Sequence, residues 1–160
     1  MRIWRIATDT PAYTADDATG EGARLSGGRW NRKGTPMLYC ASSISLACLE
    51  TIIHLGAGEM PLNRYLVEVN VPIGLWKNRK AFDHYTAPVG WDALPVGKAS
   101  LDAGDAWIAS NKSLLLVVPS VIVPEDRNVL INPLHPDAGE LQFKKIRKWL
   151  YDGRIKAPAT

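Results

Sequence analysis

The sequence predicts a single α+β domain that extends over residues 1–160. Three observations lead to this prediction. The chain is 160 residues long, which fits one domain of ordinary size. Hydrophobic residues make up 46% of the chain and charged residues 22%, a composition that is typical of globular proteins and unlike that of disordered ones. Segments with the pattern of strands are interspersed with helical segments, and no repeat, linker or low-complexity tract divides them.

Three segments in the first half of the chain have the pattern of strands. Residues 2–6 and residues 64–71 alternate between apolar and polar side chains, and Pro72 ends the second of these runs. Residues 37–41 form a compact apolar run, which suits a buried strand. Residues 9–28 are rich in Thr, Ala, Asp and Gly, so we expect mostly irregular structure that ends in a tight turn.

A helix is predicted directly after residues 37–41. Ser42 or Ser43 can cap this helix by accepting a hydrogen bond from a backbone N–H. Leu46, Leu49 and Ile53 then recur at the spacing of one helix face. We therefore expect these three side chains to form a stripe directed into the core.

The second half of the chain contains loops, one helix and the central strands. Residues 73–97 are interpreted as loops and short turns, and residues 100–110 as a helix that carries Trp107 inward. Apolar runs predict central strands that meet at a bend: residues 114–118, 121–123 and 129–131. Residues 140–151 fit either a helix or an irregular last strand, because periodicity does not distinguish the two there.

Composition and charge limit the classes of function. Cys40 and Cys48 are too far apart for a Cys-x-x-Cys pair, and we interpret both as small buried apolar groups. The net charge is +3, and the densest basic cluster is interpreted as a solvated face, so no direct nucleic-acid binding is expected. That cluster contains Lys144, Lys145, Arg147 and Lys148. No apolar run approaches the roughly 20 residues that span a bilayer, and no signal-peptide pattern opens the chain, so we expect a cytoplasmic protein.

Two segments of the chain contain candidate catalytic or ligand-binding residues. Glu50 is a lone carboxylate in the apolar segment 43–55, and Arg29 and Trp30 follow two glycines. Glycines allow close approach of a ligand to the main chain, and a guanidinium can bind a diphosphate through two parallel hydrogen bonds. Arg29 is thus a candidate anion clamp, Glu50 a candidate catalytic acid and Trp30 a candidate stacking partner. The alternatives are a turn arginine paired with a surface carboxylate, an exposed helix residue and a packed core tryptophan.

Other polar groups are weaker candidates. Tyr39, in an apolar strand, could offer a ring and a hydroxyl to a ligand, or could be an ordinary packed tyrosine. Ser120 could bond a substrate, but no Gly-x-Ser-x-Gly elbow surrounds it. The three histidines lack the spacing of a zinc site, so no metal is expected. Residues 20–25 lack the last glycine of a dinucleotide-binding loop, which argues against a doubly wound sheet.

Taken together, these motifs resemble those of the RES-domain toxin family, over nearly the whole chain and in the expected order. The resemblance is carried by residues 22–31 (Gly-Ala-Arg-Leu-Ser-Gly-Gly-Arg-Trp-Asn), 38–41, 49–50, 118–120, 128, 131–133 and 135–136. The arginine, glutamate and serine that name the family correspond here to Arg29, Glu50 and Ser120. The resemblance implies that Arg29 and Ser120 contact NAD+, that Tyr39 packs on its nicotinamide end, and that Glu50 is the catalytic acid. Trp30 belongs to the same NAD+ site.

The resemblance also implies a fold, a reaction and partners. The fold is similar to that of the ADP-ribosyltransferase toxins, with a split mixed β core and a few short helices. The reaction consumes NAD+ as a substrate, by hydrolysis or by phosphorolysis, and no separate cofactor is implied. The partner is a helix-turn-helix antitoxin of the Xre type that covers the active site, in a complex that contains a toxin homodimer. A role for the basic cluster near the C-terminus does not follow from the resemblance.

The residues fit this chemistry, and two alternatives stay open. Cleavage of the nicotinamide–ribose bond builds positive charge on the sugar, and a fixed carboxylate such as that of Glu50 stabilises it. The first alternative is a protein ADP-ribosyltransferase that uses the same pocket. The second is a binding module for nucleic acid or a partner, which would use Arg29, Trp30 and the basic cluster without acting on NAD+.

Overall fold

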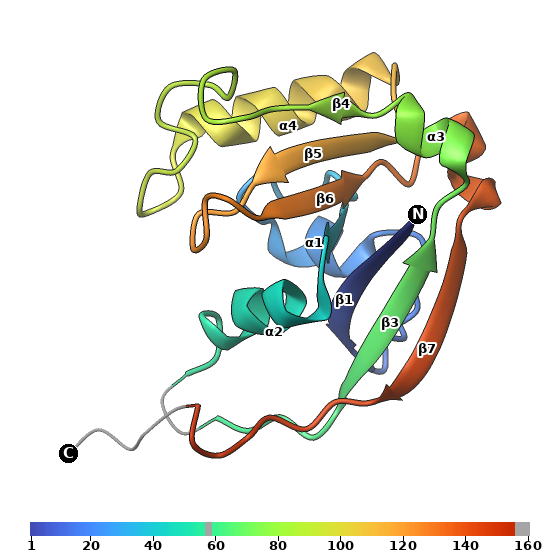
Figure 1. The fold of residues 1–160 in the computed structure, drawn as a ribbon, viewed down its shortest axis with the longest axis vertical. Coiled ribbons are helices and arrows are strands. Elements are labelled where there is room, and N and C mark those ends of the chain that lie inside the picture. The colour runs from blue at the N-terminus through green and yellow to red at the C-terminus, as the bar shows by residue number, and fades with distance from the viewer. Residues whose placement is uncertain (57–58, 156–160) are drawn as a thin grey trace.

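The fold is built on one seven-stranded mixed sheet. The computed structural model describes residues 1–56 and 59–155. The strand order is β4-β5-β6-β2-β1-β3-β7, and Figure 1 shows β5 and β6 in the upper part of the molecule and β1, β3 and β7 in the lower part. The strands are β1 (Arg2–Thr8), β2 (Leu38–Ala41), β3 (Arg64–Asn70), β4 (Lys80–Ala81), β5 (Leu115–Pro119), β6 (Arg127–Ile131) and β7 (Gln142–Lys148).

The sheet is nearly divided between β1 and β2. These two neighbours share a single residue pair, Trp4 with Ala41, whereas β1 pairs with β3 along its whole length, from Arg2 opposite Asn70 to Thr8 opposite Arg64. All the neighbours are antiparallel except β4 and β5. The prediction of an α+β domain with a split mixed β core is therefore confirmed, and the split opens a space beside the ends of β1 and β2.

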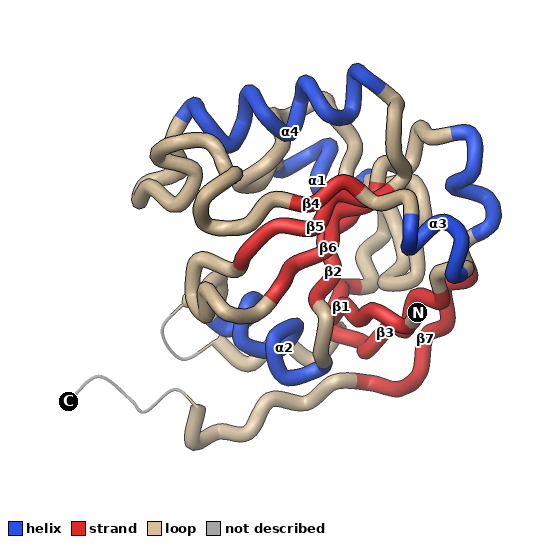
Figure 2. The backbone as a smooth tube through the Cα atoms, turned by 45° about the horizontal axis from the view of Figure 1, so that its top comes forward, coloured by secondary structure: helices blue, strands red, loops and turns tan. Residues whose placement is uncertain are grey.

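Helices cover both faces of the sheet. They are α1 (Glu21–Ser26), α2 (Ile44–Ile52), α3 (Ile73–Lys77) and α4 (Lys98–Ser110), with a 3-10 turn at Pro136–Glu140. Figure 2 shows α2 and α4 on the same side of the strands and α3 on the other. Trp107 of α4 packs on Leu116 and Leu130, and Leu46 of α2 packs on Ile6 and Leu66. The candidate site lies on the face of the sheet that α2 and α4 cover, between these two helices.

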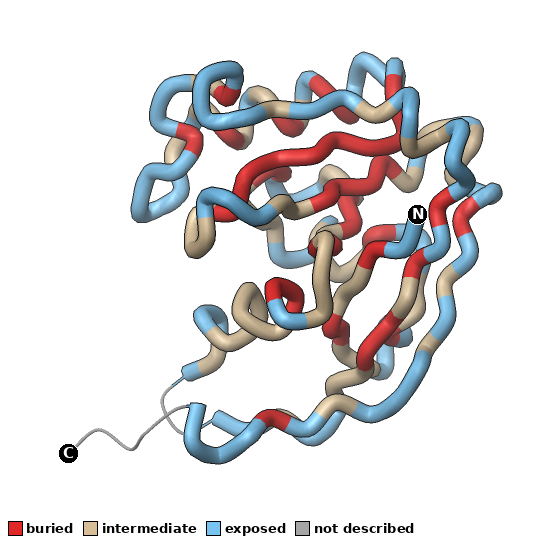
Figure 3. The backbone as a smooth tube through the Cα atoms, viewed as in Figure 1, coloured by how far each residue is buried: buried red, intermediate tan, exposed pale blue. Residues whose placement is uncertain are grey.

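The core runs through the central strands. Every residue of β5 is buried, and so are the last three of β6, as Figure 3 shows. By contrast β7 is an edge strand in which no residue is buried. The edge position fits the basic side chains of this strand, which need contact with water. The interpretation of Cys40 as a small buried group also holds, whereas Cys48 is only half-buried.

Several sequence predictions hold with shifted bounds. The first strand extends to Thr8, two residues beyond the predicted end. Ser43 caps α2, since its Oγ accepts a hydrogen bond from the Leu46 N–H at 3.1 Å. The predicted helix over 100–110 begins two residues earlier, at Lys98. The ambiguous segment 140–151 contains a strand, β7, and not a helix.

Other predictions were wrong. Ile53 does not face the core: α2 ends at Ile52, and the Ile53 side chain is 52% exposed. Residues 121–123 are not a strand, because the Ser120 side chain accepts hydrogen bonds from two backbone N–H groups there and turns the chain. The expectation for residues 9–28 holds in the main: they are mostly irregular and end in a turn, but they also contain a short helix, α1. Residues 73–97 are likewise mostly loops and turns, with α3 and the two-residue strand β4 among them.

Candidate active site

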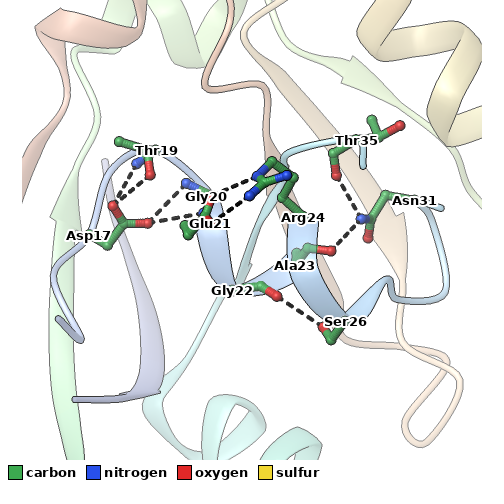
Figure 4. Close-up of polar contacts among 10 residues, drawn as sticks. All are labelled: Asp17, Thr19, Gly20, Glu21, Gly22, Ala23, Arg24, Ser26, Asn31 and Thr35. Atoms are coloured by element: carbon green, nitrogen blue, oxygen red, sulfur yellow. Dashed lines mark hydrogen bonds and ion pairs between the residues drawn. The ribbon is translucent and has the colours of Figure 1, made fainter. Parts of the chain in front are cut away.

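The arginine turn is braced by the end of α1. Gly27 has a positive φ of 70°, and the Gly28 N–H donates a hydrogen bond to the Asn31 carbonyl at 3.0 Å. The Asn31 side chain is buried and donates to the carbonyls of Ala23 and Thr35 at 2.9 and 2.8 Å, as Figure 4 shows. A side chain at position 28 would have no room, since a Cβ there would lie 2.6 Å from the hydroxyl of Tyr39. The glycine therefore allows the turn to pack directly on β2.

Arg29 is held at one end of its guanidinium only. Its Nη1 donates to the carbonyls of Trp91 and Ala93 at 3.0 and 2.9 Å. Burial lowers the pKa of Arg29, and the negative charge of Glu50 acts in the opposite direction, although an arginine stays protonated in either case. Within the described chain no group accepts from Nε or Nη2. The side chain thus presents two donor nitrogens, Nε and Nη2, and a positive charge to a ligand.

Glu50 projects from the second half of α2 and is fixed through one oxygen. Its Oε1 accepts hydrogen bonds from Ser120 Oγ at 2.8 Å and from Asn128 Nδ2 at 2.6 Å. No group in the described part of the chain donates to Oε2. A carboxylate that is oriented in this way keeps one oxygen for a reacting group. The alternative of a freely exposed helix residue is not what the structure shows.

Ser120 lies behind the carboxylate, at the end of β5. Its side chain is fully buried. Its Oγ donates to Glu50 and accepts from the Ile122 and Val123 N–H groups at 3.1 and 3.2 Å. The hydroxyl thus donates its proton and accepts hydrogen bonds within the protein itself. The arrangement makes Ser120 a support for Glu50, whereas the resemblance had implied a direct contact with NAD+.

Tyr39 and Trp30 join the arginine turn to the sheet. The Tyr39 hydroxyl donates to Asn31 Oδ1 at 2.7 Å and accepts from the Trp30 N–H at 3.0 Å. Burial raises the pKa of Tyr39, so the hydroxyl remains a donor at all ordinary pH values. The Trp30 ring is 2% exposed and stacks on Phe82 and Trp91, with ring centroids 6.1 Å apart in each case. Packing, the alternative raised for Trp30, accounts for this environment better than stacking on a ligand.

One large cavity brings these groups together. Its volume is about 1090 Å³, and its lining includes Arg29, Tyr39, Glu50 and Asn128. Ser120 is not part of the lining, although its neighbours Pro119 and Val121 are. The remaining walls come from β1, α1, the end of α2 and the loop 94–96. The cavity therefore lies at the split in the sheet and places a cation and a carboxylate on the walls of one space.

Sequence reasoning missed Asn128 as a site residue, and the histidines form no cluster around the site. Asn128 directly precedes the buried half of β6, and the signals of its role were its place among the family motifs and its position before the apolar run Val129–Ile131. His54 lines the cavity, whereas His84 bonds the Pro124 carbonyl and His135 caps the 3-10 turn. Residues 1–56 and 59–155 contain no group of three or more His, Cys, Asp or Glu side chains that could hold a metal ion.

Comparison with known proteins identifies the family. The RES domain model matches residues 2–152, so the chain belongs to the RES-domain family, as its motifs predict. A curated relative from Sphingobium sp. (strain YBL2), named "Prs ADP-ribosylating toxin", is 53% identical over 153 residues, which cover 96% of this chain and 95% of the relative. A relative named "Toxin Res" from Photorhabdus laumondii subsp. laumondii is 36% identical and covers 86% of this chain and 85% of its own length.

A solved structure agrees with the fold. The chain is similar to one in the crystal structure of the M. tuberculosis MbcT–MbcA toxin–antitoxin complex, with a TM-score of 0.61 and 15% identity. The match covers 97% of this chain and 86% of the other. At this identity the likeness concerns the fold alone. None of the helices that the structure describes has the length and apolar character needed to cross a membrane.

Proposed function

We propose that this protein is the toxin of a toxin–antitoxin system and that it cleaves the nicotinamide–ribose bond of NAD+. The observation that carries the proposal is the Glu50 carboxylate. Two donors, Ser120 and Asn128, hold one of its oxygens, the other has no donor among the described residues, and Glu50 lines the same cavity as Arg29. A fixed negative group beside a cationic clamp suits a dinucleotide whose sugar becomes positive during the reaction. The family and the toxin names of the relatives support the same assignment.

In the proposed reaction, Arg29 binds and Glu50 stabilises charge. The free Nε and Nη2 of Arg29 bind a phosphate oxygen pair of NAD+, and the Tyr39 ring lies against the nicotinamide end. The C1′–N bond breaks, and its electron pair goes to the nicotinamide nitrogen, which becomes neutral. Glu50 Oε2 stabilises the resulting positive charge on the ribose until an oxygen nucleophile bonds to C1′ from the opposite side and loses its proton. No step in this sequence uses a metal.

The identity of that nucleophile distinguishes the candidate reactions. Water gives hydrolysis, and inorganic phosphate gives phosphorolysis. Transfer to a protein side chain is the second candidate, and one observation favours it. The relative named "Prs ADP-ribosylating toxin" is 53% identical over 153 residues, which cover 96% of this chain and 95% of the relative. Prs, the target in that name, is therefore the first protein acceptor to test.

The proposal includes an antitoxin partner. A structural neighbour was solved with its antitoxin, and the family resemblance implies one of the Xre type together with a toxin homodimer. Exposed apolar side chains on the rim of the cavity provide a surface for such a partner: Ile53, Leu94 and Val96. The binding-module alternative has little support, because Lys145 of the basic cluster is paired with Asp9 and Asp16.

One experiment tests the proposal and separates the acceptors. Purified protein is incubated with NAD+ labelled in the adenosine part, with and without phosphate and with and without Prs, and free nicotinamide is measured. We expect nicotinamide release in step with NAD+ loss. Label in Prs indicates transfer, label in free ADP-ribose indicates hydrolysis, and a phosphate-dependent rate indicates phosphorolysis. Absence of nicotinamide release under all of these conditions from the folded protein would contradict the proposal.

A further inference from the structure

A second arginine, Arg64, faces the cavity from the opposite half of the sheet. It is the first residue of β3 and lies opposite Thr8, the last residue of β1. Arg64 and Thr8 both line the cavity that contains Glu50 and Arg29. Because Arg29 belongs to the turn after α1 and Arg64 to β3, the two cations reach the cavity from different walls.

The Arg64 guanidinium has no hydrogen-bond or ion-pair partner among residues 1–56 and 59–155. Its Nε is buried and makes no hydrogen bond, and the side chain forms no ion pair with any residue in the described parts of the chain. Trp149 Nε1 is the other buried side-chain donor without a partner among the described residues. That indole interacts with the half-buried thiol of Cys48 and does not line the cavity. Arg64 is therefore the buried unpaired donor that is associated with the cavity.

An unpaired, half-buried guanidinium is expected to bind a hydrogen-bond acceptor. Buried polar groups in native proteins nearly always have hydrogen-bond partners, and an exception points to a missing ligand, ion or water. Removal of a cation from water without a counter-charge is costly, and an anion at the same place offsets the cost. Guanidinium groups bind phosphate oxygens with particular geometric fit. The position of Arg64 therefore favours an anionic ligand group.

The charge of the whole cavity agrees with this assignment. Its lining contains three arginines, Arg5, Arg29 and Arg64, and one acid, Glu50, which leaves a net charge of +2 with His54 neutral. Arg5 donates to the Asp17 carbonyl at 3.3 Å, and one terminal nitrogen of Arg29 is used by carbonyls of the loop 91–93. A diphosphate carries two negative charges. One arginine that also interacts with a carboxylate therefore neutralises a diphosphate poorly.

We propose that Arg64 forms a second phosphate-binding subsite in the cavity, distinct from the one at Arg29. The ligand is a phosphate group, either the second phosphate of the dinucleotide or free inorganic phosphate. The nature of the ligand rests on the proposed NAD+ chemistry, whereas the anion site itself rests on the unpaired guanidinium and on the charge of the cavity.

The test is a binding measurement that does not depend on catalysis. Wild-type protein, Arg64→Gln and Arg64→Lys are titrated calorimetrically with inorganic phosphate, inorganic pyrophosphate and ADP-ribose. Arg79→Gln is the matched control, because Arg79 is also half-buried but does not line this cavity. We expect Arg64→Gln to weaken binding of phosphate or ADP-ribose at least tenfold, the loss that accompanies removal of one charge-assisted hydrogen bond of about 1.5–3 kcal/mol. Arg64→Lys should retain part of the affinity, and Arg79→Gln should bind like the wild type.

The three ligands separate the two sources of the phosphate. If Arg64 serves the dinucleotide, affinity for ADP-ribose falls with that for pyrophosphate. If it serves a free acceptor phosphate, affinity for inorganic phosphate falls and affinity for ADP-ribose does not. Unchanged affinity of folded Arg64→Gln and Arg64→Lys for all three ligands, or no binding by the wild type, would overturn the inference. A wild type that binds phosphate through Arg64 but releases no nicotinamide from NAD+ would refute the proposed function and leave the subsite standing.

Discussion

Replacement of Ser120 by alanine should weaken both the fold and the site, because its hydroxyl makes three hydrogen bonds. It donates to Glu50 Oε1 at 2.8 Å and accepts from the N–H groups of Ile122 and Val123. A hydrogen bond to a charged group contributes about 1.5–3 kcal/mol, and an amide left without a partner costs about 1–3 kcal/mol where water is excluded. The two amides are only partly buried, so we expect the free energy of unfolding to fall by about 3 kcal/mol in total.

The assay compares Ser120→Ala with Asn128→Ala. Asn128 donates to the same oxygen of Glu50 at 2.6 Å, but its side chain supports no backbone amide in the described chain. For a protein of this size, about 3 kcal/mol corresponds to a fall in Tm of about 6–12 °C. We expect that fall for Ser120→Ala, about half of it for Asn128→Ala, and slower nicotinamide release in both. A Ser120→Ala protein with unchanged Tm and rate would refute the reasoning.

Three further substitutions test the packing around the arginine turn. Gly28→Ala should raise KM for NAD+, since the new Cβ would lie 2.6 Å from the Tyr39 hydroxyl and displace the turn. Tyr39→Phe should lower the free energy of unfolding by about 2 kcal/mol, because it leaves the Trp30 N–H without its acceptor; equal stability in urea denaturation would contradict this. Gly104→Ala drives a Cβ into the Trp30 carbonyl, so we expect the free energy of unfolding to fall by about 3 kcal/mol or more. The control is Gly74→Ala, where a Cβ meets no atom within 4 Å, and its stability should stay close to that of the wild type.

Much of the fold could be predicted because the periodic signals were long. The helix α4 and the strands β1 and β3 each carry a full amphipathic or alternating pattern. The six residues of α1 are too few for such a pattern. Asp17, four residues before the first residue of that helix, accepts hydrogen bonds from the Gly20 and Glu21 N–H groups through its carboxylate, as Figure 4 shows, and such a contact is not visible as periodicity.

The last strand was ambiguous, and the β5–β6 turn was wrongly predicted as a strand, for physical reasons. A shift in register between Leu66 and Val67 interrupts the pairing of β3 with β7, so β7 does not alternate regularly between faces. The apolar residues 121–123 have the composition of a strand, but the hydroxyl of Ser120 takes up two of the N–H groups that a strand would need. A side chain that competes for backbone hydrogen bonds can override strand propensity.

The candidate site could be predicted in part. Arg29, Tyr39 and Glu50, which come from separate segments, line one cavity, and the family motifs indicated all three. Ser120 was also singled out, but its hydrogen bond to Glu50 depends on the approach of α2 to the end of β5. Arg64 carried no local signal, and Asn128 only a weak one, because a lone asparagine or arginine in a strand is ordinary. Their roles arise only when the sheet brings four distant segments together.

The most direct test of the account is the rate of nicotinamide release by Glu50→Gln. The amide oxygen of glutamine can still accept hydrogen bonds from Ser120 and Asn128, which now hold Glu50 Oε1, so the fold and the affinity for NAD+ should be preserved. Only the negative charge beside the ribose is lost, and loss of such electrostatic stabilisation lowers kcat by about 100-fold to 1000-fold. We predict that fall, with an unchanged Tm. A folded Glu50→Gln protein that releases nicotinamide at the wild-type rate would contradict the central claim.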